Sequence, residues 1–142
     1  MERGVSLPKC KAILLCERTI MEAGTGKITL VNTFSRFVVD KIPGNTVAVE
    51  AFCQFTDAEG LYDLVIEIRD LNRRNAVLAR AVGMAVDVPG RLVHANVIVP
   101  IPRLRIQHEG SYDFVLLANG EEIDRTSFYV QERQSEDQQD ED

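Results

Sequence analysis

The chain has 142 residues, of which 45% are hydrophobic and 27% charged, and its formal net charge is −6. This length suits one domain, and the apolar share excludes a disordered chain, because so much hydrophobic area can offset the entropy of ordering. The longest apolar run is only a handful of residues, which excludes a membrane-spanning helix. Five acids follow Gln134, so residues 1–133 hold 17 acids against 16 bases and are almost neutral.

Hydrophobic residues recur at every second position along much of the chain. Successive side chains of a β-strand point to opposite faces, so such a stretch predicts a strand with one face toward a core. The alternation places Val47, Ile66, Val97 and Phe114 among the inward residues. In chain order, we expect about eight strands, at 10–17, 27–38, 46–55, 61–70, 77–87, 91–101, 111–118 and 122–131.

Turn residues separate these stretches at short intervals. Pro43-Gly44-Asn45 and Asn119-Gly120 are examples, and Asn-Gly is the strongest short signal of a hairpin. One stretch, 73–86, also suits a helix, because it is rich in alanine. Its valines, its glycine and the flanking turn residues favour a strand. The pattern predicts an all-β fold, an antiparallel β-sandwich of about eight strands.

A local pattern narrows this prediction to an immunoglobulin-like sandwich. Gly110 stands two places before Tyr112, an inward residue at the start of a strand. This spacing resembles the tyrosine corner, in which the phenol bonds back to the backbone a few residues upstream. The cysteine and tryptophan hallmarks of antibody domains are missing.

Composition also divides the chain into segments and indicates a compartment. We expect an N-terminal extension at 1–9, the β-sandwich domain at 10–133 and a disordered acidic tail at 134–142, which has no apolar side chain. The N-terminus does not read as a secretory signal. The odd number of cysteines, three, predicts reduced thiols and a cytoplasmic protein. Bases and acids are interspersed, so no basic stripe predicts binding to nucleic acid.

No motif predicts catalysis or a bound cofactor. Gly24-Thr25-Gly26-Lys27 resembles the end of a phosphate-binding loop, but Met21 and Ile28 stand where that motif needs Gly and Ser or Thr. A strand rather than a helix is expected to follow, so no helix N-terminus is available for a phosphate. There is no serine elbow and no Cys beside a His. We therefore expect no enzyme, although a site assembled from distant residues stays open.

Calcium is the metal that the sequence favours over others. His94 and His108 have no partner at ligand spacing. Asp57, Glu59 and Asp63 lie near one turn, and carboxylates from loops are calcium ligands. Because no other loop is rich in carboxylates, solvated surface charge is the preferred interpretation. A small-ligand or calcium-dependent module that uses these loops is the alternative function.

The outward faces of the predicted strands are not uniformly polar. Phe52, Val65, Val115 and Leu117 all fall on them. Contiguous exposed apolar area usually marks a partner surface, so these four residues form the predicted interaction surface. The other interpretation is that a neighbouring segment, such as 10–17 or 34–39, covers them.

Several short motifs of the chain form one recognisable set. They are 12–17 (AILLCE), 22–27 (EAGTGK), Leu30, Gly110, Tyr112, Asn119 and Gly120. With these motifs the chain resembles a family of small, uncharacterised bacterial domains, which opens with an apolar strand that ends in Cys and an acid, followed by a glycine turn before Lys and a second apolar strand. The likeness covers about residues 10–131 and implies a β-sandwich and a bacterial origin, but no catalytic residue, cofactor or partner.

Together these features predict a non-enzymatic binding module without a cofactor. The predicted function is protein–protein interaction or self-association, through an exposed sheet face or through strand addition at an unpaired edge. No membrane partner and no nucleic acid are expected.

Overall fold

The structure, a computed structural model, describes residues 8–88 and 94–134, except for the side chains at 81–84 and 88. These residues form eleven strands and one short 3-10 turn, so the fold is all-β. The elements are β1 (Lys9–Met21), β2 (Ile28–Phe34), β3 (Arg36–Val39), β4 (Gly44–Asn45), β5 (Val49–Thr56), β6 (Gly60–Asp70), η1 (Leu71–Arg73), β7 (Ala76–Val88), β8 (Ala95–Ile101), β9 (Arg105–Ile106), β10 (Gly110–Ala118) and β11 (Glu121–Glu132).

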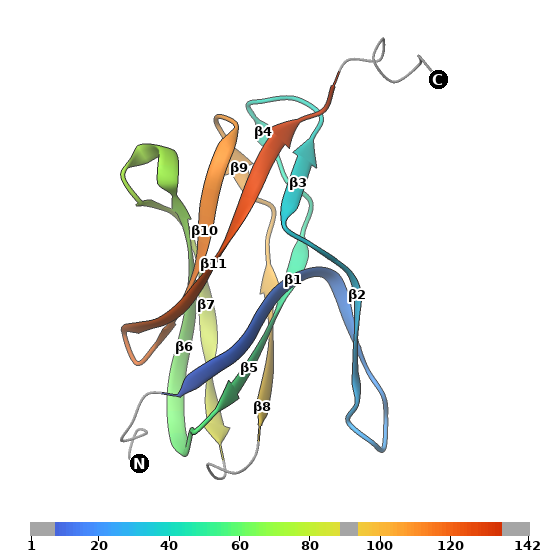
Figure 1. Cartoon of the computed structure of the whole chain (residues 1–142), viewed down its shortest axis with the longest axis vertical. Coiled ribbons are helices and arrows are strands. Elements are labelled where there is room, and N and C mark those ends of the chain that lie inside the picture. The colour runs from blue at the N-terminus through green and yellow to red at the C-terminus, as the bar shows by residue number, and fades with distance from the viewer. Residues whose placement is uncertain (1–7, 89–93, 135–142) are drawn as a thin grey trace.

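The strands form two main sheets and one small one (Figure 1). The four-stranded sheet has the order β2-β1-β5-β8 and curls into a half-barrel. The five-stranded sheet has the order β3-β11-β10-β6-β7, and the small sheet consists of β4 and β9. Neighbouring strands are antiparallel except β3, which runs parallel to β11. The edge strands are therefore β2 and β8 in one main sheet and β3 and β7 in the other.

Strands lie within all eight predicted ranges, and several differ from the prediction in extent. The strand predicted at 46–55 begins at Val49, and within the described residues the strand predicted at 91–101 begins at Ala95. The first strand continues to Met21 and forms a hairpin with β2. The predicted strand 27–38 is interrupted at Ser35, where the chain passes from the four-stranded to the five-stranded sheet. The stretch 73–86, which also suited a helix, contributes the strand β7.

The core consists of the inward residues of both main sheets. Ile66 and Phe114 from one sheet and Val97 from the other are buried in one hydrophobic cluster, as the alternation predicted. The prediction was wrong for Val47, which is 63% exposed. Thr46 and Leu104 exchange two hydrogen bonds of 2.9 Å, which hold the chain before β5 against the segment that leads into β9.

Tyr112 closes one end of the core. Its hydroxyl donates to the carbonyl of His108 at 2.7 Å, which is the bond expected of a tyrosine corner. The His108 ring stacks on the Tyr112 ring, and its Nε2 lies 2.9 Å from Oδ2 of the buried Asp70. Burial and the charge of Asp70 raise the pKa of Tyr112 to about 12. Gly110 has a φ of +139°, and a Cβ there would meet the side chain of Asn72 at 2.3 Å.

Two predictions concern segments that the structure describes only in small part. The expected N-terminal extension contributes Pro8 and Lys9, of which Lys9 already belongs to β1, and the expected tail contributes only Gln134. The rest of both segments lies outside the described residues. Nowhere in 8–88 or 94–134 is there a helix long and apolar enough to cross a membrane.

Candidate functional site

The fold separates the four residues of the predicted interaction surface. Val65, Val115 and Leu117 lie on the outer side of the five-stranded sheet, where Leu117 is directly opposite Val65. Phe52 lies on β5 of the other sheet. The prediction that these residues are exposed was wrong for Val115, which is 0% exposed, and for Phe52, at 9%. Val65 and Leu117 are half-buried.

A layer of charged side chains explains the burial of Val115. In the sheet register, Val115 is flanked by Glu67 on β6 and by Arg125 on β11. Arg125 donates to Asp113 at 2.8 Å and to Glu122 at 2.7 Å, and Glu67 bonds both Arg69 and Arg80. These bonds hold long side chains down on the sheet, where their aliphatic parts can cover apolar neighbours. We call Glu67, Arg69, Arg80, Asp113, Glu122 and Arg125 the charged layer.

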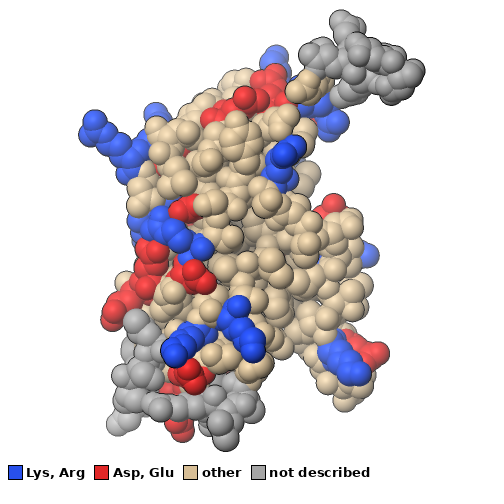
Figure 2. Space-filling model, in the orientation of Figure 1, with Lys and Arg blue, Asp and Glu red and all other residues tan. Residues whose placement is uncertain are grey.

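The charged layer is a structural network. Burial alone would raise the pKa of Glu67, but the hydrogen bonds from Arg69 and Arg80 outweigh it and hold that pKa below its ordinary value. The hydrogen bond from Arg125 likewise lowers the pKa of Glu122. Carboxylates that are paired and ionised in this way do not serve as general acids near neutral pH. Figure 2 shows charged side chains of both signs on the left of the molecule, where β6, β10 and the start of β11 lie.

Phe52 belongs to an apolar row on the outer side of the four-stranded sheet. It stands between Leu14 on β1 and Ile98 on β8 in the register. Only Leu14 is substantially exposed. A hydrogen bond between Gln54 and Asn96 borders the row on one side. The row is therefore narrow, and Phe52 itself is nearly covered.

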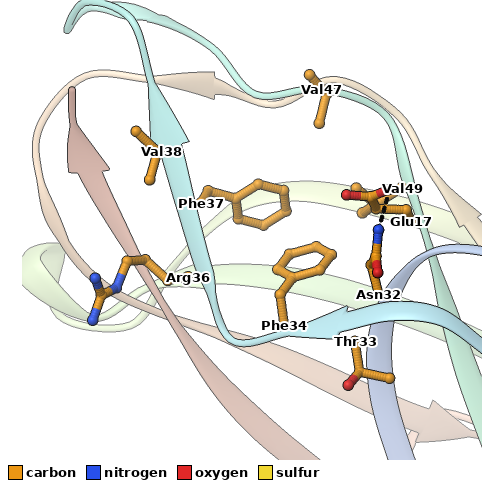
Figure 3. Close-up of a pocket in the computed structure, with 9 residues that line it drawn as sticks. All are labelled: Glu17, Asn32, Thr33, Phe34, Arg36, Phe37, Val38, Val47 and Val49. Atoms are coloured by element: carbon orange, nitrogen blue, oxygen red, sulfur yellow. Dashed lines mark hydrogen bonds between the residues drawn. The ribbon is translucent and has the colours of Figure 1, made fainter.

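A groove of about 210 Å³ lies beside β3, and we call it the β3 groove. Phe34 and Phe37 point into the space between β3 and the segment that carries Val47 (Figure 3). On the same face, side chains other than Lys, Arg, Asp and Glu cover most of the area around β2 and β3 (Figure 2). The groove is lined by Glu17, Asn32, Thr33, Phe34, Arg36, Phe37, Val38, Val47 and Val49.

The passage of the chain between the sheets creates this groove. Asn32 has a φ of +54°, a conformation that Asn adopts more readily than most residues, and its Nδ2 donates to Glu17 Oε1 at 3.0 Å. The break at Ser35 lets Phe34 and Phe37 face the same side although they are three residues apart. Their rings meet edge to face at 4.9 Å.

The backbone of β3 is open on the side away from β11. The carbonyl of Ser35 accepts from Tyr129 N at 2.9 Å, and that of Val39 accepts from Arg133 N at 2.7 Å. Peptide groups alternate in direction along a strand, so those of Arg36 and Val38 point away from β11. No strand among the described residues pairs with β3 on that side. Val38 is 49% exposed.

The carboxylates of the alternative calcium prediction do not gather. Across the described parts of the chain, no three His, Cys, Asp or Glu side chains lie close enough together to hold a metal ion, and Asp57, Glu59 and Asp63 are all described. Asp57 instead lies 3.4 Å from the ammonium group of Lys9.

The cysteines are poor candidates for nucleophiles. Cys16 and Cys53 are buried and Cys10 is half-buried, all as free thiols. Burial raises the pKa of Cys10 and of Cys53 to about 12, and the charge of Asp124 adds to the shift at Cys10. The thiolate, which is the reactive form, is therefore scarce at neutral pH.

Sequence reasoning missed the residues of the β3 groove. It assigned Val47 to the core, predicted one strand at 27–38, and considered 34–39 as a segment that could cover other residues. One signal was available: Phe34 and Phe37 are separated by three positions, which breaks a period of two and indicates a bend between them.

Residues 11–131 match the model of a family described as a family of unknown function (DUF6941). No curated protein matches the chain. One solved structure with some likeness is that of the Pseudomonas fluorescens alkylpurine DNA glycosylase AlkC bound to DNA containing an abasic site analog. It is 11% identical with a TM-score of 0.44, and the match covers 68% of this chain but 28% of the glycosylase. At that TM-score the likeness carries no argument about function.

Proposed function

The chain belongs to this family of unknown function (DUF6941). We propose that the chain has a non-enzymatic role, in which it binds an extended segment of a protein along the open edge of β3. The bound segment adds a strand to the five-stranded sheet and places an apolar side chain over the β3 groove. In this mode, backbone hydrogen bonds provide affinity, and pockets for alternate side chains provide specificity.

One observation carries the proposal: an open strand edge and an apolar groove lie side by side. The peptide groups of Arg36 and Val38 point outward from β3, and Phe37, between them, lines the groove. An added strand would therefore meet hydrogen-bonding groups and apolar surface together. The outer face of the five-stranded sheet offers no comparable site, because the charged layer covers Val115.

We further propose that the two main sheets form an immunoglobulin-like sandwich. Two features support this arrangement: a core cluster to which both sheets contribute, and the bond from Tyr112 to the carbonyl of His108. In such a sandwich, β3 and the β3 groove lie along one side, between the sheets, where an added strand has free access.

A peptide selection tests the proposed binding. A phage-displayed library of random linear 12-residue peptides is selected on the full chain, and we expect enrichment of extended sequences with alternating apolar residues. Val38→Pro removes an outward N–H without removing a bond to β11, because proline has no N–H, so the selected peptides should lose most of their affinity. Val47→Asp places a charge beside the groove and should weaken binding without touching a strand.

Val77→Asp is the matched control, because Val77 is 50% exposed and lies on β7, the opposite edge strand of the same sheet. It should leave peptide binding unchanged. Circular dichroism and thermal melts establish that each variant is folded. Equal binding by folded Val38→Pro and Val47→Asp variants would refute the proposal.

A further inference from the structure

We propose that the segment bound at this edge is β3 of a second copy of the chain, so that two copies join their five-stranded sheets through antiparallel β3 strands. The inference rests on the proposed function, since it names the partner of the same site. It comes from the order of residues along the edge: Arg36, Val38 and Asp40 occupy alternate positions with Val38 at the centre.

The hydrogen-bonding geometry permits this pairing in one register. Arg36 and Val38 direct their peptide groups to the open side, and β3 ends at Val39, so Asp40 directly follows the strand. When Val38 faces Val38 of the second copy, Arg36 faces Asp40. The central Val38 pair is then a hydrogen-bonded pair, in which each residue directs its N–H and C=O at the other, and Arg36 directs its peptide group at the residue that it faces. A shift by one residue would bring together peptide groups that point away from each other.

The charges fit the same register. It places the cation of Arg36 opposite the anion of Asp40 twice, once on each side of the central Val38 pair. Oppositely charged residues that face each other across two strands stabilise a sheet, whereas like charges destabilise it. Within the described residues, Arg36 makes no ion pair, and the side chain of Asp40 is 86% exposed. Arg133 bonds only Oδ1 of Asp40, at 2.8 Å, so the second oxygen remains for Arg36 of the other copy.

Apolar contact accompanies the charge pairs. Val38 would be covered by Val38 of the second copy, and the half-exposed Tyr129 lies on the neighbouring strand, in register with Arg36. A two-fold axis passes through the Val38 pair, so the same surface of each copy contacts the other. Two-fold symmetry of this kind is the commonest among protein oligomers. On the opposite edge strand, β7, the charge of Arg80 is paired with the buried Glu67, whereas Arg36 on β3 makes no ion pair within the described residues.

Charge reversal tests the inference on the full chain by sedimentation equilibrium at low salt. The wild-type chain should associate to a dimer. Arg36→Asp and Asp40→Arg each turn two attractive pairs into two repulsive ones, so each should weaken dimerisation roughly ten-fold or more. An equimolar mixture of the two variants restores opposite charges at both positions and should form heterodimers. The double variant Arg36→Asp/Asp40→Arg should dimerise by itself.

Lys27→Asp is the control, since it reverses an exposed charge in the turn between β1 and β2, at the end of β2 that is farther from β3, and should leave dimerisation unchanged. A wild-type chain that stays monomeric, or a mixture of the two single variants that stays monomeric, would overturn the second-copy inference. Selected peptides that still require the N–H of Val38 would in that event uphold strand addition at β3. A dimer that persists in Val38→Pro would show that the copies meet at another surface.

Discussion

The outer face of the five-stranded sheet and the open edge of β3 both carry outward-pointing valines, and the two sites differ in what covers them. Val115 lies on a central strand, and the charged residues on both neighbouring strands leave it 0% exposed. Val38 lies on the last strand of the same sheet, has a neighbouring strand on one side only, and is 49% exposed.

Outward orientation and solvent exposure of a side chain are therefore separate properties. Alternation along a strand decides which face a side chain takes. Whether that side chain meets solvent depends on the neighbouring strands, which come from distant parts of the sequence. In this protein, the outward valine of a central strand is covered between salt-bridged side chains, while the outward valine of an edge strand next to a crossover is exposed.

The largest effect is expected at the covered site. Val115→Asp places a carboxylate at a position without solvent exposure, directly opposite Glu67. Arg125, on the other side of this position, already bonds Asp113 and Glu122, so the new charge has no ion-pair partner of its own. Such a buried charge is strongly destabilising, and the free energy of unfolding should fall by about 3 kcal/mol or more. The same substitution at Val38 should change it by no more than about 0.5 kcal/mol. Urea unfolding of both variants measures the difference, and equal losses would show that the two valines are covered alike.

A second prediction concerns the charged layer itself. Glu67→Gln removes the charge that pairs with Arg69 and Arg80, and should lower the free energy of unfolding at neutral pH by about 1–3 kcal/mol. Because the folded-state pKa of Glu67 is depressed, its stabilisation is present above the unfolded-state pKa and is lost as the pH falls through the folded-state pKa.

The difference in the free energy of unfolding between wild type and Glu67→Gln should therefore be largest at pH 7 and should shrink as the pH falls below about 4.5. Chemical unfolding at a series of pH values measures it. Glu59→Gln, the control, alters an exposed carboxylate outside the charged layer. Its free energy of unfolding should equal that of the wild type at every pH. A difference for Glu67→Gln that widens in acid would contradict the assigned role of Glu67.

The strands were predictable from the sequence because alternation is a local property. Ile66, Val97 and Phe114 face the core as their positions in period-two stretches predicted. The same reasoning failed for Val47, because the hydrogen bonds between Thr46 and Leu104 join residues 58 positions apart. No local pattern reports such a contact.

The candidate site was less predictable for a related reason. Exposure of Val115 depends on strand order, which brings Glu67 and Arg125 to its two sides from distant stretches of the chain. The β3 groove depends on the interruption at Ser35, which the sequence indicates only through the spacing of Phe34 and Phe37. Face assignment is therefore local, whereas covering and openness are set by the tertiary arrangement.

The smallest effect is expected at the bend that shapes the open site. Asn32 has a φ of +54°. In this left-handed conformation an alanine is destabilised by about 1 kcal/mol, and a glycine is hardly destabilised. Asn32→Ala should therefore lower the free energy of unfolding by about 1 kcal/mol, and Asn32→Gly by less, because Gly loses only the bond to Glu17. Thr33→Ala, at the next and equally exposed position, controls for loss of side chain alone. The midpoints of urea unfolding rank the three variants by stability. Because the bend positions Phe34, the affinity of Asn32→Gly for the selected peptides should be closer to that of the wild type than the affinity of Asn32→Ala. An Ala variant more stable than the Gly variant would mean that the left-handed conformation is not what holds the groove in shape.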